Sequence, residues 1–240
     1  MRILEFEVYT KSLSSIFNDC NSRCIISTIN PHSYIIAMND EEFSDALKSS
    51  DVLLPDGSGI LLAAAILNGK RIEKKTGPDS LRYALNRLNK TKSRVYFLGS
   101  TDKTLDLITT KVTYEYENIE LKTYSPPFCR QFTPEENDSI IEDIRNFKPD
   151  LICVGMTAPK QEKWVYENQQ YLPECYIMSI GAAFDWFSGA KKEPSDFAKM
   201  FHIAWLERFA REPVRMLPRI GSMFKFLYII FSAKLAEKVK

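Results

Sequence analysis

The sequence predicts an α/β protein: a Rossmann-like, mostly parallel β-sheet with helices on both faces, plus a C-terminal helical appendage. Two features of the chain support this prediction. Short apolar stretches typical of buried strands alternate with helix-length segments, which is the pattern of βαβ units. After Phe197 no convincing strand remains, and the chain becomes basic and amphipathic. We therefore divide the 240 residues into an α/β domain at 1–195 and an appendage at 196–240.

Six segments are predicted to be strands because each is a short run rich in apolar, β-branched or aromatic residues. The clearest is Arg-Val-Tyr-Phe-Leu at 94–98, which ends at Gly99. The pair Pro126 and Pro127 breaks the chain into a loop after the fourth strand. In chain order the predicted strands are residues 23–29, 52–54, 94–98, 119–124, 151–154 and 176–180.

The segments between these strands have helical length and signals for helix starts. Residues 59–67 are apolar and Ala-rich, which predicts a buried helix. Asp79 is placed to cap a helix that runs to about Leu88. Thr133 and Glu136 have the spacing of a capping box, which predicts a helix start at Thr133. The remaining helices are predicted at residues 40–49, 101–114 and 160–170.

The appendage is predicted to begin with an amphipathic helix at residues 200–211 that stops near Pro213. Beyond Pro213, Lys and Arg residues are interleaved with apolar and aromatic ones. A basic, aromatic-rich amphipathic segment fits the plane of a membrane interface. The alternative is a C-terminal helix that packs on the core or on another subunit, so a homo-oligomer stays open.

Composition and charge exclude several classes of protein. A net charge of +1 gives no overall field that favours nucleic acid. The five cysteines are scattered without a CxxC pair, so we expect reduced, buried thiols in a cytosolic protein. The two histidines, His32 and His202, lack metal-ligand spacing. The first nine residues lack an apolar core, so we expect no signal peptide, and no run reaches the roughly 18 apolar residues of a membrane span.

Three polar motifs follow predicted strands and open predicted helices. They are the sequences Leu-Pro-Asp-Gly-Ser-Gly at 54–59, Pro-Lys-Gln-Glu at 159–162 and Gly-Ala-Ala-Phe-Asp at 181–185. In an open α/β sheet such junctions lie at the carboxyl ends of the strands, where ligands bind. The three motifs therefore predict one shared site.

Asp56 is the candidate general base, because a carboxylate at a strand end can have its pKa tuned by partial burial. The alternative is a carboxylate that only caps the following helix. The glycines that follow, Gly57 and Gly59, form no dinucleotide fingerprint, and the chain has no P-loop. It also has no Asp-x-Asp pair to hold a metal ion against a diphosphate, so helix N-termini and Lys or Arg would have to neutralise one.

Other candidates for substrate binding lie at the same strand ends. Thr28 and Asn30 can bond sugar hydroxyls or a pyrimidine ring, or can simply mark the exit from a strand. Lys74 can meet a phosphate, although a lone Lys is usually a solvated surface residue. Gln161 and Glu162 can bond hydroxyls, or can be a helix start that favours acids. Asp185 can bind substrate or serve as a structural cap.

Together these residues resemble the WecG/TagA/CpsF family of bacterial glycosyltransferases, over roughly residues 25–219. The order and spacing of many elements make the resemblance specific. The matching elements are Thr28-Ile29-Asn30, Leu54-Pro55-Asp56-Gly57-Ser58-Gly59-Ile60, Gly77-Pro78-Asp79, Phe97-Leu98-Gly99, Lys148-Pro149-Asp150, Val154-Gly155, Pro159-Lys160-Gln161-Glu162-Lys163-Trp164, Gly181 with Phe184-Asp185, and Trp205-Leu206 with Arg208, Glu212-Pro213 and Arg215.

The resemblance implies an inverting, metal-independent glycosyltransferase without a cofactor. Such an enzyme moves a hexose or N-acetylhexosamine from a UDP-sugar to a polyprenyl-diphosphate-linked saccharide, at the inner face of the bacterial cytoplasmic membrane. The resemblance places this reaction in cell-surface polysaccharide biosynthesis. It also implies that Asp56 is the general base and that Thr28, Asn30 and Gln161 contact substrate. The appendage would cover the site and meet the membrane. The residues that would contact the diphosphate or the membrane are Arg208, Arg211, Arg215 and Arg219.

Three positions depart from the family pattern. Lys74 stands where the family usually has Arg, so bidentate phosphate binding is lost although the charge remains. Residues 189–194 replace a usual Arg-Ala-Pro run, and Ala204 replaces a family carboxylate. These departures keep alternatives open: another nucleotide-dependent enzyme, such as a hydrolase or epimerase, or a non-catalytic, nucleotide-sugar-binding partner of a polysaccharide assembly complex. Asp56 is retained, which favours an active enzyme.

Overall fold

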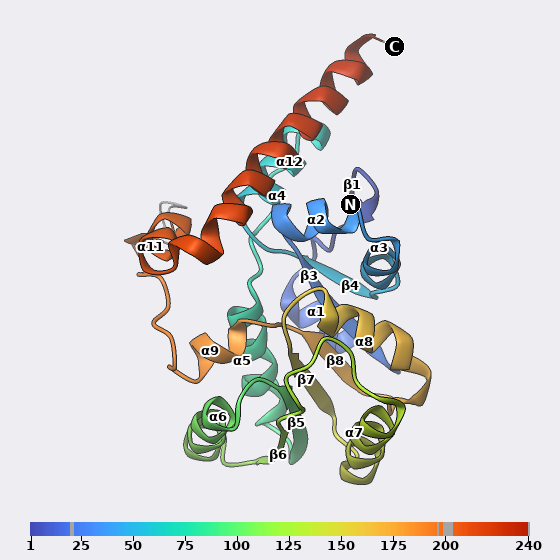
Figure 1. Ribbon diagram of the computed structural model, residues 1–240, viewed down its shortest axis with the longest axis vertical. Coiled ribbons are helices and arrows are strands. Elements are labelled where there is room, and N and C mark those ends of the chain that lie inside the picture. The colour runs from blue at the N-terminus through green and yellow to red at the C-terminus, as the bar shows by residue number, and fades with distance from the viewer. Residues whose placement is uncertain (20–21, 196, 199–203, 240) are drawn as a thin grey trace.

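The computed structural model describes residues 1–19, 22–195, 197–198 and 204–239, and its centre is a six-stranded parallel sheet (Figure 1). The strand order is β4-β3-β8-β7-β5-β6. All neighbouring strands in this sheet are parallel, which confirms the predicted fold class. The strands are β3 (Cys24–Ile29), β4 (Val52–Pro55), β5 (Ser93–Gly99), β6 (Ile119–Tyr124), β7 (Leu151–Gly155) and β8 (Tyr176–Ser179).

Helices cover both faces of the sheet, as predicted. Alternate side chains along each strand point to opposite faces. In β4, Leu54 joins a core with α1, α5, α6 and α9, whereas Leu53 joins a core with α2, α3, α4 and the last helix. A third core, under α7 and α8, takes Ile152 of β7. The helices are α1 (Leu13–Asp19), α2 (Pro31–Ala37), α3 (Glu41–Lys48), α4 (Ser58–Asn68), α5 (Gly77–Leu88), α6 (Asp102–Glu115), α7 (Pro134–Phe147), α8 (Lys160–Asn168) and α9 (Ala183–Phe187).

Local signals account for most helix starts. The predicted capping box is present, with the Thr133 side chain accepting from the Glu136 N–H at 3.2 Å. The prediction that Asp79 caps α5 is wrong, because the helix begins at Gly77 and its N-cap is Thr76. The Thr76 hydroxyl accepts from the Asp79 N–H at 3.3 Å, so Asp79 lies in the first turn. The predicted helix at 160–170 ends as α8 followed by a 3₁₀ turn, Gln169–Tyr171.

Several short elements were not anticipated from the sequence. An antiparallel pair, β1 (Arg2–Ile3) and β2 (Phe6–Glu7), precedes α1. Two short helices, α2 and α9, begin directly after strand ends. Each is too short to show helical periodicity, which is the signal that identifies longer helices. Both lie at the carboxyl edge of the sheet, where the candidate site is expected.

Within residues 204–239, the part of the appendage described from its first complete helix onward, lie α11 (Ala204–Arg211) and α12 (Pro213–Val239). The predicted start of the first helix at 200–203 lies outside the described residues, and its end before Pro213 is confirmed. Figure 1 shows α12 crossing α2 and α4 and then extending beyond the rest of the chain. Phe226 and Ile230 of α12 are buried in the core that α2 and α4 share. Phe226 meets the Tyr34 ring of α2 edge-on, with ring centroids 5.0 Å apart.

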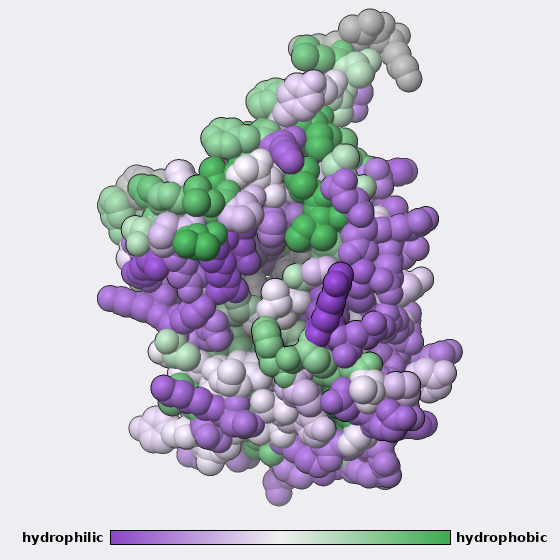
Figure 2. Space-filling view, viewed as in Figure 1, coloured by the Kyte–Doolittle hydropathy of each residue, from purple (hydrophilic) through white to green (hydrophobic). Residues whose placement is uncertain are grey.

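A second apolar stripe of α12 faces away from the protein. Its side chains are between 52% and 75% exposed, and Figure 2 shows apolar surface gathered over this helix. By length and composition alone, Pro213–Glu237 is the one segment of the described chain able to cross a membrane, with 22% of its apolar window buried. The sequence predicted no such segment, because only unbroken apolar runs were considered as membrane spans. That criterion missed α12, a helix that continues through Pro218. The exposed residues are Leu217, Phe224, Tyr228, Phe231 and Leu235.

The expectation of buried cysteines is confirmed for Cys24, Cys153 and Cys175 and is wrong for Cys129, which is partly exposed. Cys20 and His202 lie outside the described residues.

The packing of α12 predicts different costs for two neighbouring phenylalanines. Phe226→Ala removes a fully buried ring and should lower the free energy of unfolding by about 3–5 kcal/mol. Phe224→Ala, on the 69% exposed ring two residues earlier, should change it by less than about 0.5 kcal/mol. Urea denaturation of both variants measures the difference. Equal effects would show that α12 does not pack in this orientation.

Candidate active site

The site is built around Asp56, at the end of β4. The Asp56 N–H donates to the carbonyl of Ile29 at 2.9 Å, which fixes Asp56 beside the exit of β3. Gly57 follows with φ +89°, a backbone conformation that side chains other than hydrogen rarely allow. A Cβ on Gly57 would lie 3.8 Å from the Cβ of Asn30. The glycine therefore lets the chain turn from β4 into α4 directly against the end of β3.

The loop before α5 brings cationic side chains to the same edge. The Lys75 N–H donates to the carbonyl of Pro55 at 2.9 Å, so this loop runs alongside the end of β4. Lys74, the predicted phosphate contact, is exposed and acts electrostatically on Asp56. Lys75 was not anticipated: it is 5% exposed, and its ammonium lies 4.0 Å from Glu73. A motif search does not find this buried lysine, whose backbone lies beside the end of β4.

The C-terminal helices contribute two arginines. Arg208 of α11 and Arg219 of α12 both interact electrostatically with Asp56. The Arg208 guanidinium lies over the Trp186 ring, 4.7 Å from its centroid, which holds it against α9. The loop before α5 and the distant C-terminal helices therefore both bring positive charge to one carboxylate.

The pKa of Asp56 is raised above its ordinary value because burial disfavours the charged carboxylate. Lys74, Arg208 and Arg219 oppose this effect, and Asp79 adds to it. In the described chain no side-chain hydrogen bond or ion pair holds the carboxylate. A partly desolvated carboxylate that is free to accept a proton, with cations nearby, has the properties of a general base.

The arginines form a cluster with more positive charge than nearby carboxylates neutralise. Burial, together with the charges of Arg208 and Arg215, lowers the pKa of Arg219 to about 10. Glu212 offsets part of this charge, with its carboxylate 3.4 Å from Arg215 and 2.8 Å from Lys191. Guanidinium groups gathered at a partly buried site favour a phosphate-bearing ligand, which would supply the missing negative charge.

Thr28 and Asn30 lie where the sequence predicted, at the end of β3. Thr28 is paired in register with Leu54 and is partly exposed. The Asn30 Oδ1 accepts from the N–H groups of His32 and Ser33, both at 3.0 Å, so Asn30 caps α2. Its carbonyl oxygen is therefore committed to the fold. Only its amide NH2 remains to meet a ligand.

Gln161 and Glu162 are much more buried than a surface helix start would be, with exposures of 3% and 4%. The Gln161 amide donates to Glu162 Oε1 at 2.8 Å. Gln161 Oε1 and Glu162 Oε2 have no partner among the described residues. Gly181, at φ +47°, allows this approach, because a Cβ there would lie 3.2 Å from Gln161 Oε1. Buried, unpaired polar atoms at a strand end are suited to bind ligand hydroxyls.

Two predicted site residues do not face Asp56. The Asp185 carboxylate lies 3.2 Å from the Lys191 ammonium, which also contacts Glu212 of the appendage. The Arg211 guanidinium donates to the carbonyl of Lys192 at 2.9 Å. Both side chains join the segment after α9 to the appendage helices.

Contacts between α2 and α12 were also missed by sequence reasoning. His32 Nδ1 and the Ser222 hydroxyl are 2.9 Å apart. Burial and the charge of Arg219 lower the pKa of His32, so the imidazole is neutral near pH 7. Nothing local in the sequence marks this pair, because its members are far apart along the chain. It ties α12 to the first turn of α2.

Known proteins resemble this chain over most of its length. The sequence model of the glycosyl transferase WecG/TagA/CpsF family matches residues 1–240. A protein of Bacillus subtilis strain 168 is 28% identical over 80% of this chain and 73% of its own length. A protein of Staphylococcus aureus strain MW2 is 25% identical over 93% of this chain and 85% of its own. Both are named N-acetylglucosaminyldiphosphoundecaprenol N-acetyl-beta-D-mannosaminyltransferase.

Glu162 predicts a pH dependence of stability. Burial raises its pKa from 4.5 to about 7, so the folded protein holds this proton more tightly than the unfolded chain does. The wild type should therefore lose stability as pH rises from about 4.5 through 7, by at most about 3 kcal/mol. Glu162→Gln keeps the acceptor oxygen for Gln161 but cannot ionise. Its stability relative to wild type should rise between pH 5 and pH 8.

Chemical denaturation at both pH values measures this difference. Glu142→Gln, at an exposed position on α7, is the control and should run parallel to wild type. Parallel curves for Glu162→Gln as well would mean that Glu162 is not buried as described.

Proposed function

The chain belongs to the WecG/TagA/CpsF family of glycosyl transferases, and we propose that it moves a hexose or N-acetylhexosamine from a UDP-sugar to a polyprenyl-diphosphate-linked saccharide in bacterial cell-surface polysaccharide biosynthesis. The observation that carries this proposal is the desolvated Asp56 carboxylate at the strand ends, with Lys74, Arg208 and Arg219 around it. In this proposal residues 1–195 form the catalytic domain and 196–240 its appendage.

Asp56 acts as the general base. Its carboxylate takes the proton of the acceptor hydroxyl as that oxygen attacks the anomeric carbon of the donor sugar. The new glycosidic bond forms on the face opposite UDP, and the bond from the anomeric carbon to the diphosphate oxygen breaks with its electron pair. The configuration at the anomeric carbon is therefore inverted. The partial burial of Asp56 supports this role, because it raises the carboxylate's affinity for the proton.

The leaving diphosphate needs positive charge as the bond breaks. Arg208 and Arg219, which already lie in the field of Asp56, are placed to supply it without a metal ion. Gln161 and Glu162 offer unpaired buried oxygens for sugar hydroxyls. Asn30 offers its amide NH2 to the donor.

The acceptor follows from the relatives. Their name specifies a saccharide linked through diphosphate to undecaprenol. We propose the same chemical class of acceptor for this chain, used at the inner face of the cytoplasmic membrane. The exposed apolar stripe of α12 supports peripheral membrane association, since it leaves large apolar side chains uncovered on a helix that also packs on the core through Phe226 and Ile230.

The proposed function predicts the effect of removing the general base. Asp56→Asn should lower acceptor-dependent UDP release at least about 100-fold, the scale of a lost general base. The assay uses a panel of UDP-sugars with a short-chain polyprenyl-diphosphate-GlcNAc acceptor in EDTA, and wild-type release should survive the chelator. Asp45→Asn, exposed on α3, is the control. Release without any acceptor would indicate a hydrolase or epimerase, and UDP binding without release would favour a non-catalytic partner.

The proposed function also predicts how the charges around Asp56 affect the pH dependence of the reaction. The base must be ionised, so kcat/KM should fall as pH drops below the pKa of Asp56. Lys74→Gln removes a charge that lowers this pKa and should move the acidic limb to higher pH, by up to about one unit. Asp79→Asn removes a charge that raises it and should move the limb to lower pH.

Lys70→Gln, in the same loop but without such an effect on Asp56, serves as the control for these pH profiles. Shifts of the same sign in the Lys74 and Asp79 variants would contradict the assignment of the limb to Asp56.

A further inference from the structure

A hydrogen bond joins the first turn of α2 to α12, and neither of its residues has a role in the chemistry proposed above. His32 Nδ1 and the Ser222 hydroxyl are 2.9 Å apart, and this hydroxyl also donates to the carbonyl of Pro218 at 2.9 Å. A hydroxyl has one proton, so Ser222 can only accept from His32, and Nδ1 carries the ring proton. His32 is neutral near pH 7, because burial and the charge of Arg219 lower its pKa. Its other nitrogen, Nε2, is therefore unprotonated.

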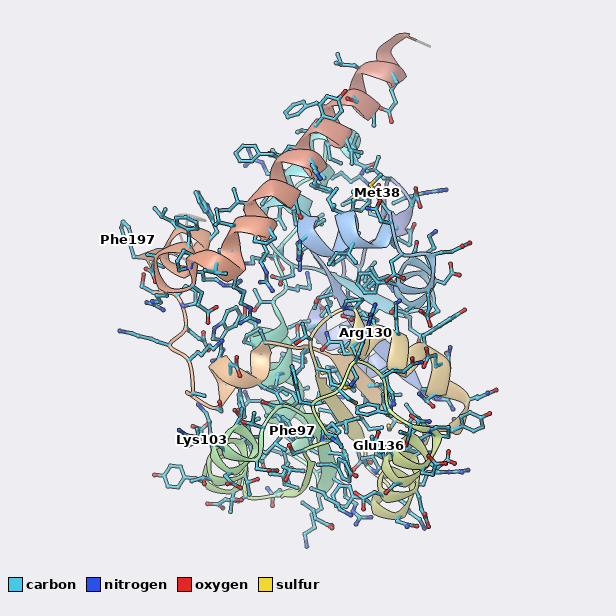
Figure 3. The ribbon with its side chains drawn as sticks, in the orientation of Figure 1. Met38, Phe97, Lys103, Arg130, Glu136 and Phe197 are labelled. Atoms are coloured by element: carbon cyan, nitrogen blue, oxygen red, sulfur yellow. The ribbon has the colours of Figure 1, made fainter. Side chains whose placement is uncertain are left out.

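The histidine is fixed to the same strand end as Asp56. The His32 N–H donates to Asn30 Oδ1 at 3.0 Å, within the cap of α2. The Asp56 N–H donates at 2.9 Å to the carbonyl of Ile29, the residue just before that cap. Figure 3 labels Met38 at the far end of α2, so the hydrogen bond to α12 is made at the end of this helix nearer Asp56. The candidate base and the imidazole are both held at the end of β3.

The serine lies on the same face of α12 as Arg219. The two residues are three apart, so their side chains are neighbours on the helix surface. The residue before Arg219 is Pro218, which has no N–H and removes one backbone hydrogen bond from this turn. Of the described hydrogen bonds that join α12 to residues 1–195, the one from Ser222 lies near this weakened turn, and the other is made by Lys234, far along the helix.

The Arg219 guanidinium depends on such an attachment, because its own interactions do not hold it in place. Burial and the charges of Arg208 and Arg215 disfavour its charged form. Asp56 and Glu212 attract it, but no hydrogen bond or ion pair to it occurs among the described residues. The position of this guanidinium is therefore set by how its turn of α12 is fixed to the rest of the protein.

We propose that the hydrogen bond from His32 to Ser222 is a positioning contact that holds Arg219 in the field of the candidate base. It locks the proline-containing turn of α12 onto the first turn of α2, which is itself fixed to the end of β3. Neither partner touches a reacting atom. The effect on the reaction rests on the proposed function, in which Arg219 stabilises the leaving diphosphate, whereas the effect on the charge around Asp56 does not.

A titration of the Asp56 carboxyl carbon by ¹³C NMR tests this placement without turnover. Ser222→Ala removes the hydrogen bond and changes no charge, so a raised pKa of Asp56 would report that Arg219 has moved away. The rise should be at least about half of the rise that Arg219→Gln causes. Ser222→Ala added to Arg219→Gln should cause no further rise, because the contact acts through Arg219.

The matched control is Ser232→Ala, which removes an exposed hydroxyl from the same helix and should titrate as wild type does. An unchanged pKa of Asp56 in Ser222→Ala would overturn the proposal. So would a rise that adds in full to that of Arg219→Gln. A loss of stability in urea without a change in this pKa would mean that the pair only packs α12, and would also overturn it.

Variants of His32 test the assigned tautomer. The amide NH2 of Asn can donate from close to the place of Nδ1, whereas that of Gln reaches the place of Nε2. His32→Asn should therefore leave the pKa of Asp56 near its wild-type value, and His32→Gln should raise it as Ser222→Ala does. The imidazole ¹⁵N shifts of wild type at pH 7 should show the proton on Nδ1. Equal pKa values in the two variants, or a proton on Nε2, would contradict the proposal.

Turnover separates this proposal from the proposed function. Acceptor-dependent UDP release should fall at least about 10-fold in Ser222→Ala and stay at the wild-type rate in Ser232→Ala, because a small displacement of a charge that stabilises the transition state lowers the rate steeply. Unchanged release from Ser222→Ala would overturn the proposal. Wild type without any turnover would refute the proposed function, and the titrations would still decide whether the contact places Arg219.

Discussion

The close contact of three helices at Gly59 is the constraint on which the candidate site depends. A Cβ at this position would lie 2.4 Å from the Cγ of Pro31 and 2.9 Å from the Sδ of Met223. The proline ring cannot move aside as a flexible chain end could, so α2 reaches α4 only because residue 59 has no side chain. Met223 places α12 across both helices. This packing sets where the arginines of the appendage stand relative to Asp56.

The electrostatics of the site follow from that packing. Here Asp56 is buried and the appendage brings Arg208 and Arg219 near it, and burial and these charges act on its pKa in opposite directions. The result is a base that is partly protected from solvent and still ionisable. Nearby carboxylates neutralise the positive charge of these arginines only in part, and a substrate diphosphate can neutralise the rest.

The sequence predicted the sheet and the position of the site better than the site's contacts. Strand ends follow from short apolar runs, so Asp56 could be placed at the carboxyl edge without a structure. The role of Asn30 as the cap of α2 was missed, although the proline after it was a usable signal. No local pattern separates Arg208, which faces Asp56, from Arg211, which does not. That choice depends on how α11 is rotated, and the contact with Trp186 that fixes the rotation joins distant parts of the chain.

The central claim is that the appendage holds its arginines in the field of the Asp56 carboxylate. The most direct test is the pKa of Asp56 itself, from the ¹³C chemical shift of its carboxyl carbon during an NMR titration. Arg208→Gln and Arg219→Gln should each raise this pKa, because each removes a charge that lowers it. Arg211→Gln, which removes the same charge one turn further along α11, should leave it unchanged. Equal titrations in all four proteins would contradict the account.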